Sequence, residues 1–266
     1  RSCPYRCSFC GVAAIWTRKW TSFTAERIVK EIDHYVEKYG CKGIYFREDL
    51  FTTDMRRVEN MCDLLLQREY KIKWACEARA DITNPVILEK MSKSGCIGLY
   101  CGIESGSASG LLKKKKDLTV DTMRKFFTYT KQLGINVYAT FCMGTPHETQ
   151  DELKETEEFI EEINPYVVDR FAYLGLPKSS DYNYLDENKL YYHKDCAGII
   201  YTERFYELAH ALYHKNDQRL HFLKQQKRFL DENKNVLSDL ELASHRFEPM
   251  SEDLEVTSST RNEYAQ

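Results

Sequence analysis

The chain has 266 residues, and its 38 basic and 41 acidic side chains give a formal net charge of −3 at pH 7. Such a balance argues against a broad nucleic-acid surface, which needs a basic excess, and no apolar run approaches the roughly 20 residues that span a bilayer. Seven of the ten cysteines are scattered singly, which argues against a disulfide framework and for a reducing compartment. We therefore expect a cytoplasmic protein with no nucleic-acid partner and no membrane span.

From residue 22 to about residue 175, apolar strand-like runs alternate with segments of helical periodicity. Strands are predicted over 43–49, 71–79, 97–104, 136–144 and 166–175. Helices are predicted between them, beginning at the N-cap residues Thr24, Asp54, Asn84, Thr119 and Thr149. Beyond them, a polar loop is predicted over 177–195 and helical structure over 202–235.

Apolar strands separated by helices predict an α/β fold with a parallel sheet covered by helices. Right-handed crossovers can close such a sheet into a full or partial barrel, and an open doubly wound sheet is the alternative. The G-x-G-x-x-G pattern of many open sheets is absent. In both folds ligands bind at the carboxyl ends of the strands. The residues predicted there are Glu48, Asp49, Arg79, Asp81, Glu104, Ser105 and Gly144.

The segment RSCPYRCSFC places Cys3, Cys7 and Cys10 in a C-x₃-C-x₂-C pattern. A structural zinc site takes four Cys or His ligands, and the next cysteine is as distant as Cys41. The interpretation as unligated thiols is also poor, because three cysteines lie together in one short loop. A [4Fe–4S] cluster held by three thiolates leaves one iron with an open position, where chemistry can take place.

Other features have plainer interpretations. Cys76, Cys101 and Cys142 lie in apolar stretches and are predicted to be buried in the core. The four lysines at 113–116 are predicted to form a solvated helix end rather than a phosphate-binding patch. The tyrosines of the loop at 177–195 could line a substrate cavity or pack a lid; these are Tyr182, Tyr184, Tyr191 and Tyr192.

The cysteine spacing closely resembles that of radical S-adenosylmethionine (SAM) enzymes. Four further segments resemble the strand-end motifs of the subgroup that usually carries an N-terminal cobalamin-binding domain: YFREDLFTTD (45–54), WACEARAD (74–81), YCGIESGS (100–107) and MGTPHETQDE (143–152). Together these motifs cover residues 1–175 in the family's order. The resemblance implies a partial (β/α)6 TIM-like barrel with parallel strands, whose first strand would precede Arg1, followed by C-terminal helices.

The resemblance also implies roles for individual residues. Cys3, Cys7 and Cys10 would hold the [4Fe–4S] cluster, whose open iron binds SAM. Phe9 would lie where the backbone approaches the adenine, and Gly144 would belong to the glycine motif that lets the backbone come close to the adenine. Thr145 and His147 stand where relatives commonly have Leu and Gly, so the resemblance does not fix the exact contacts of this loop.

The remaining SAM contacts implied by the resemblance come from strand ends. Glu48 or Asp49 would accept hydrogen bonds from the amino group of SAM, and Glu104 with Ser105 would contact the ribose. Arg79 would pair with the methionyl carboxylate, or alternatively form an internal salt bridge with Asp81.

We expect a radical SAM core barrel over residues 1–200, a helical extension over 201–243 and a disordered tail over 244–266. The family chemistry is reductive cleavage of SAM to a 5′-deoxyadenosyl radical, which would methylate or rearrange a small-molecule or lipid-like organic substrate. The electron donor would be of flavodoxin or ferredoxin type, and cobalamin, if used, would come through an upstream domain. The alternative from another class is a non-enzymatic zinc- or iron–sulfur-binding module that serves binding or electron transfer.

Overall fold

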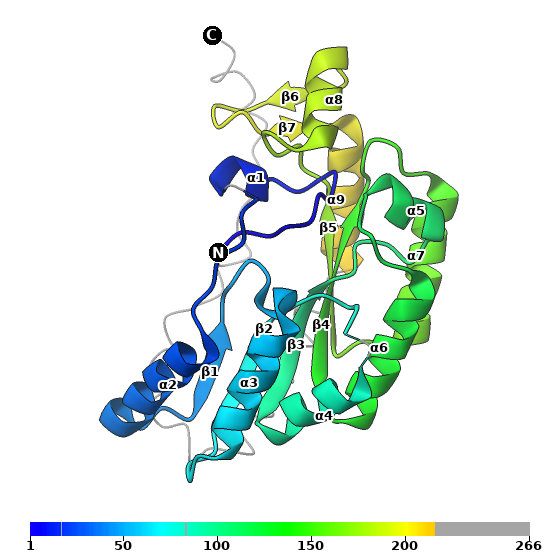
Figure 1. Ribbon diagram of the computed structural model, residues 1–266. Coiled ribbons are helices and arrows are strands. Elements are labelled where there is room, and N and C mark those ends of the chain that lie inside the picture. Colours follow the sequence, from blue (N-terminus) through cyan, green and yellow to red (C-terminus); the bar gives the residue numbers. More distant parts are fainter. Residues whose placement is uncertain (17, 83, 216–266) are drawn as a thin grey trace, which may run out of the picture. The chain divides into compact units, whose positions relative to one another are not determined.

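A sheet of five parallel strands forms the centre of the fold (Figure 1). The computed structural model describes residues 1–16, 18–82 and 84–215. The strands are hydrogen-bonded in sequence order, and they are β1 (Gly43–Phe46), β2 (Lys73–Ala78), β3 (Cys96–Gly102), β4 (Asn136–Met143) and β5 (Val167–Ala172). The five predicted strands and the α/β fold with a parallel sheet are therefore confirmed.

The helices between the strands begin at the residues that the sequence predicts. The Thr24, Asp54, Asn84 and Thr119 side chains each accept a hydrogen bond from the first turn of the helix that follows. Thr149 and Glu152 form a reciprocal capping box. The helices are α2 (Ala25–Tyr39), α3 (Met55–Leu66), α4 (Pro85–Lys93), α5 (Ala108–Lys113), α6 (Val120–Gln132) and α7 (Gln150–Ile163).

The two faces of the sheet differ in character. One face packs against the helices and forms the apolar core, where Trp74, Leu99 and Phe141 are at most 1% exposed. Because successive strand residues point to opposite faces, Tyr100 and Tyr138 lie on the other face. That face carries polar and aromatic side chains, and Tyr45 on β1 is 41% exposed there.

The segment after β5 differs from the prediction. The loop predicted over 177–195 contains a helix, α8 (Ser180–Asn188), because the Ser179 hydroxyl caps its first turn. A small antiparallel pair follows, β6 (His193–Lys194) and β7 (Ile200–Tyr201). Figure 1 shows α8, this pair and the short helix α1 (Val12–Ile15) gathered at one end of the sheet.

The predicted helical segment after residue 202 begins with α9 (Glu203–Lys215), whose Leu212 joins the main core. The rest of that segment, most of the extension predicted over 201–243, and the predicted tail at 244–266 lie outside the described residues. In the described part of the chain, no helix has the length and apolar character needed to cross a bilayer.

Candidate active site

The loop that carries the three cysteines, residues 3–10, is held through Ser8. The Ser8 N–H donates to the Lys114 carbonyl at 2.9 Å, and its hydroxyl donates to Asp181 Oδ2 at 2.9 Å. The Asp181 N–H donates back to the Ser8 carbonyl at 3.0 Å. Just before the loop, the Ser2 N–H donates to Asp49 Oδ2 at 2.6 Å. The cysteine loop is thus fixed by segments that follow β1, β3 and β5.

Cys3, Cys7 and Cys10 are free thiols and are partly buried. Burial raises the pKa of all three thiols, and the nearby Lys116 ammonium acts in the opposite direction. Within residues 1–16, 18–82 and 84–215, no three Cys, His, Asp or Glu side chains are grouped closely enough to hold a single metal ion. A [4Fe–4S] cluster binds each thiolate through a different iron and does not require that grouping. Three thiols beside a cation therefore suit an anionic cluster.

A buried ion pair lies beside the cysteines. Lys116 Nζ is 3.2 Å from Glu104 Oε1, and both side chains are 10% exposed. Burial lowers the pKa of Lys116, but Glu104 and Cys7 outweigh it, so the pKa is raised and the side chain stays a cation. The Glu104 backbone has φ of 69°, a conformation that few residues other than glycine adopt. The ion pair with Lys116 is the contact that holds this carboxylate at the site.

The prediction of a solvated lysine run is wrong for two of its four members. Lys114 and Lys116 are only 1% and 8% exposed. Lys114 Nζ pairs with Glu148, whose second carboxylate oxygen accepts the Gly144 N–H. Sequence reasoning missed these residues because a run of like charges predicts exposure, whereas Lys114 is buried through a partner 34 residues away. Together, Lys114 and Glu148 join the cysteine loop to the glycine loop after β4.

Arg79 lies at the same edge and is buried. Its Nε donates to Asp81 Oδ2 at 2.8 Å, and its guanidinium stacks on the Tyr5 ring, 3.8 Å from the centroid. Arg79 Nη2 also donates to the carbonyls of Lys116 and Asp117. The internal salt bridge left open by the sequence is therefore present, and contact between Arg79 and a SAM carboxylate stays a prediction.

Glu48 and Asp49 are adjacent in sequence but have different partners. Glu48 accepts two hydrogen bonds from the Arg57 guanidinium, from Nη1 to Oε1 at 2.9 Å and from Nη2 to Oε2 at 3.0 Å. Asp49 accepts the Ser2 N–H and so supports the cysteine loop. A role for either residue in binding the amino group of SAM stays a prediction.

The other predicted SAM contacts also lie near the cysteine loop or at the strand ends. The Ser105 hydroxyl is fully buried and lies 3.1 Å from Thr156 Oγ1, so in this structure it joins β3 to α7. Phe9 packs against the small apolar cluster of Tyr173, Leu185 and Ile200. Gly144 has φ of 82°, which a residue with a Cβ rarely adopts. The SAM roles of these residues stay predictions.

The predicted core cysteines divide into two groups. Cys76 and Cys101 are fully buried, as predicted. Cys142 packs against the small apolar cluster that Phe9 contacts but is only partly buried, so the prediction of full burial is wrong for this residue. The reason is the alternation of β4, which directs Phe141 to the helix-covered core and Cys142 to the opposite face.

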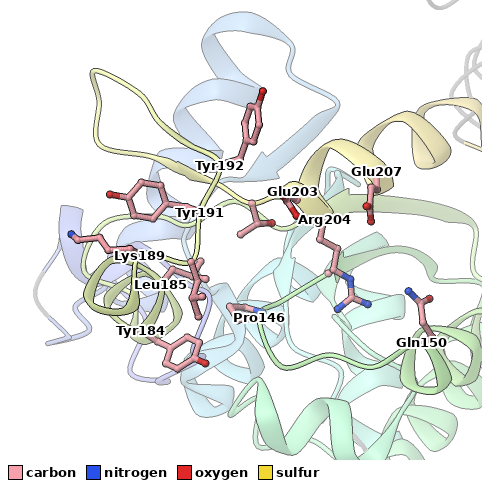
Figure 2. Close-up of a pocket in the computed structure, with 13 residues that line it drawn as sticks. Pro146, Gln150, Tyr184, Leu185, Lys189, Tyr191, Tyr192, Glu203, Arg204 and Glu207 are labelled. Atoms are coloured by element: carbon pink, nitrogen blue, oxygen red, sulfur yellow. The ribbon is translucent and has the colours of Figure 1, made fainter.

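A cavity of about 550 Å³ lies beside Gly144, bounded by the loop after β4, by α8 and by the start of α9 (Figure 2). Three of the tyrosines singled out from sequence, Tyr184, Tyr191 and Tyr192, line it. Tyr182 instead packs against the small apolar cluster. Figure 2 shows the Arg204 guanidinium directed toward Gln150 within this cavity, and Arg204 also donates to the Glu148 carbonyl. None of the three cysteines lines it.

Comparison with known proteins decides the family. A model of the radical SAM superfamily matches residues 1–160, which is more than half of the chain. The chain belongs to the radical SAM superfamily. This superfamily consists of enzymes that use SAM and a [4Fe–4S] cluster, so the resemblance predicted from the motifs is confirmed.

Relatives are similar over the same region. An uncharacterized methyltransferase of Pyrococcus horikoshii is 28% identical over 164 residues, which are 62% of this chain and 36% of the relative. The hopanoid C-2 methylase of Rhodopseudomonas palustris is 26% identical over 201 residues, 73% of this chain and 38% of that enzyme. The chain thus spans little more than a third of the length of these curated relatives.

Solved structures support the fold. The apo form of the cobalamin-dependent SAM radical enzyme OxsB superposes with a TM-score of 0.65 at 18% identity, covering 93% of this chain and 42% of that one. The radical SAM methyltransferase TsrM of Kitasatospora setae superposes with a TM-score of 0.63 at 14% identity, covering 70% of this chain and 37% of that one. These likenesses show the partial barrel fold.

Proposed function

We propose that this chain is the SAM-cleaving core of a radical SAM enzyme and that Cys3, Cys7 and Cys10 hold its [4Fe–4S] cluster. The observation that carries the proposal is the cysteine loop, which is anchored at the carboxyl edge of a parallel sheet beside the Lys116–Glu104 pair. When bound, the cluster would supply the electron that cleaves SAM into methionine and a 5′-deoxyadenosyl radical.

The residues around the loop would position the two reactants. Lys116 and Arg79 place two cations near the thiols, which favours the thiolate forms that bind iron. Phe9, Glu48 or Asp49, Arg79, Glu104, Ser105 and Gly144 are the proposed SAM contacts. Because their backbones are held by strand ends and by buried hydrogen bonds, the site would keep SAM oriented toward the cluster.

The reaction that follows is proposed to be methylation or rearrangement of an organic substrate. Both curated relatives described above carry methylase or methyltransferase names, and an anaerobic magnesium-protoporphyrin IX monomethyl ester cyclase of Rubrivivax gelatinosus is 24% identical over 181 residues. Cobalamin, if used, would be bound by an upstream domain, and a flavodoxin- or ferredoxin-type protein would donate the electron. All ten cysteines are free, which suits the proposed cytoplasmic location.

An anaerobic assay tests this function. The chain is reconstituted with iron and sulfide, reduced with dithionite and given SAM, and 5′-deoxyadenosine is measured by chromatography. Wild type should form it, and Cys7→Ala should lose both the brown absorbance of the cluster and the product. Cys41→Ala is the matched control, because this partly buried thiol lies outside the cysteine loop. A protein that binds zinc tightly and never cleaves SAM would instead support the non-enzymatic module.

A further inference from the structure

Lys114, which ends α5, connects the cysteine loop with the glycine loop, residues 144–148. Its backbone carbonyl accepts the Ser8 N–H of the cysteine loop at 2.9 Å. Its side-chain ammonium pairs with the carboxylate of Glu148 in the glycine loop. One residue therefore holds the first loop through its main chain and the second loop through its side chain.

The Glu148 carboxylate bridges two groups. Its Oε1 accepts a hydrogen bond from Lys114 Nζ, and its Oε2 accepts the Gly144 N–H. The Glu148 main chain is also engaged, because its N–H donates to the Thr145 carbonyl at 3.0 Å and its carbonyl accepts a hydrogen bond from Arg204. Since the two carboxylate oxygens belong to one planar group, the bond to Lys114 sets the orientation in which the other oxygen meets Gly144.

The Gly144 backbone has little freedom to adjust. Its φ of 82° is rarely adopted by a residue with a Cβ, and a Cβ built there would lie 2.4 Å from Leu208 of α9. The Gly144 backbone is thus held by contacts from α9 and from Glu148. A change in the orientation of the Glu148 carboxylate would therefore act directly on the backbone that is proposed to approach the adenine of SAM.

Stability alone is a weak reason for this ion pair. The side chains of Lys114 and Glu148 are each 1% exposed, so both charges have lost their contact with water. The attraction within such a pair roughly repays that loss, and well-packed apolar residues of similar volume are often equally stable in its place. Apolar residues would not, however, supply a charged hydrogen bond with a fixed direction. The pair therefore serves the geometry of the two loops.

We propose that Lys114 is a positioning residue for SAM, which acts through Glu148 to hold Gly144 in a fixed place relative to the cysteine loop. The inference rests on the proposed function, in which Gly144 lies against the adenine and the cysteine loop holds the cluster. Without Lys114 the glycine loop would spend less time in the conformation that binds SAM, and the affinity for SAM would fall by the same factor.

The test compares variants of the full chain with reconstituted cluster. Equilibrium dialysis measures SAM binding per cluster, from the iron content of each sample, and formation of 5′-deoxyadenosine is followed against SAM concentration. Lys114→Met should weaken SAM binding and raise KM at least about tenfold, whereas kcat at saturating SAM should stay close to wild type. The control is Lys115→Met, the neighbouring lysine, whose side chain is exposed and whose loss should change neither value.

A second variant separates positioning from stability. Lys114→Met leaves Glu148 buried without its cation, which itself destabilises the chain. Lys114→Met combined with Glu148→Gln removes both charges, so urea unfolding should show that stability returns. The affinity for SAM should stay low in this double variant, because no cation orients the side chain at position 148.

Several outcomes would overturn the proposal. Recovery of SAM affinity together with stability in the double variant would show that Lys114 acts through folding alone. Unchanged SAM affinity in Lys114→Met, or a loss of kcat with no rise in KM, would overturn it as well. A wild type that binds SAM but forms no 5′-deoxyadenosine refutes the proposed function and leaves the dialysis comparison intact, whereas a wild type that binds no SAM overturns both.

Discussion

Asp181, at the beginning of α8, connects the segment after β5 with the cysteine loop. Its carboxylate is 7% exposed and accepts the Ser8 hydroxyl at 2.9 Å. A buried hydrogen bond to a charged group contributes about 1.5–3 kcal/mol, and 1.4 kcal/mol corresponds to a factor of ten in an equilibrium constant. Loss of this one bond should therefore raise the population of the open cysteine loop roughly 10- to 150-fold.

We would measure this effect in a double-mutant cycle. Ser8→Ala and Asp181→Ala each remove the bond, but both leave the backbone pair between residues 8 and 181 intact. The rate at which an iron chelator strips the reconstituted cluster reports how often the loop opens. Each single variant should speed iron loss by that factor, and the double variant should be little faster than either one.

The control for this cycle is Asp186→Ala, also on α8. Its carboxylate bonds to Lys194 at 3.1 Å rather than to the cysteine loop, so iron loss should match wild type. If the effects of Ser8→Ala and Asp181→Ala simply multiply in the double variant, the two side chains act independently and the proposed clamp on the loop is refuted.

Three further predictions concern the loops around the site. The pKa of Glu152 is lowered to about 2 from 4.5, since Lys113, Ser109 and the Thr149 N–H outweigh the cost of its burial. The stability that this shift contributes is complete above pH 4.5 and is lost as the pH falls to about 2. Glu152→Gln should therefore lower the free energy of unfolding in urea by up to about 3 kcal/mol at pH 7 and by almost nothing near pH 2. An equal loss at both pH values would contradict this. Lys116→Met leaves Glu104 buried without its cation and should lower the free energy of unfolding by about 3–5 kcal/mol. Adding Glu104→Gln to the same chain should restore much of this loss. Urea unfolding in which the second substitution restores nothing would argue against the ion pair. Gly144→Ala should lower the melting temperature more than Gly40→Ala, because both backbones have positive φ but only at Gly144 would the new Cβ lie 2.4 Å from Leu208; similar decreases would show that the contact is unimportant.

The sequence predicted the elements whose causes are local. A cap such as Thr24 or Thr149 bonds to a backbone N–H only three residues away, so its effect is visible in a short window. The strands were found because a buried strand leaves either an apolar run or an alternation of apolar and polar residues in the sequence. The cysteine spacing was equally local, and it gave the family before any geometry was known.

Features that depend on distant partners could not be read in this way. The helix α8 was missed because its segment is polar and lacks a strong apolar stripe, and only its Ser179 cap favours a helix locally. The burial of Lys114 depends on Glu148, and that of Lys116 depends on Glu104. A lysine is buried only where a counter-charge compensates the loss of water, and that counter-charge is brought by another strand or loop.

By itself, then, the sequence determined the order of strands and helices, the cap of each predicted helix and the three thiols that define the family. The tertiary structure decided which groups surround those thiols: Ser8 meets Asp181 across 173 residues, and Glu104 meets Lys116 where two neighbouring loops come together. It also decided that Tyr100, Tyr138 and Glu77 share one face beneath the site. The physical reason is that hydrogen-bond caps and apolar periodicity act between near neighbours, whereas pairing of buried charges and alignment of strands depend on how the whole chain packs.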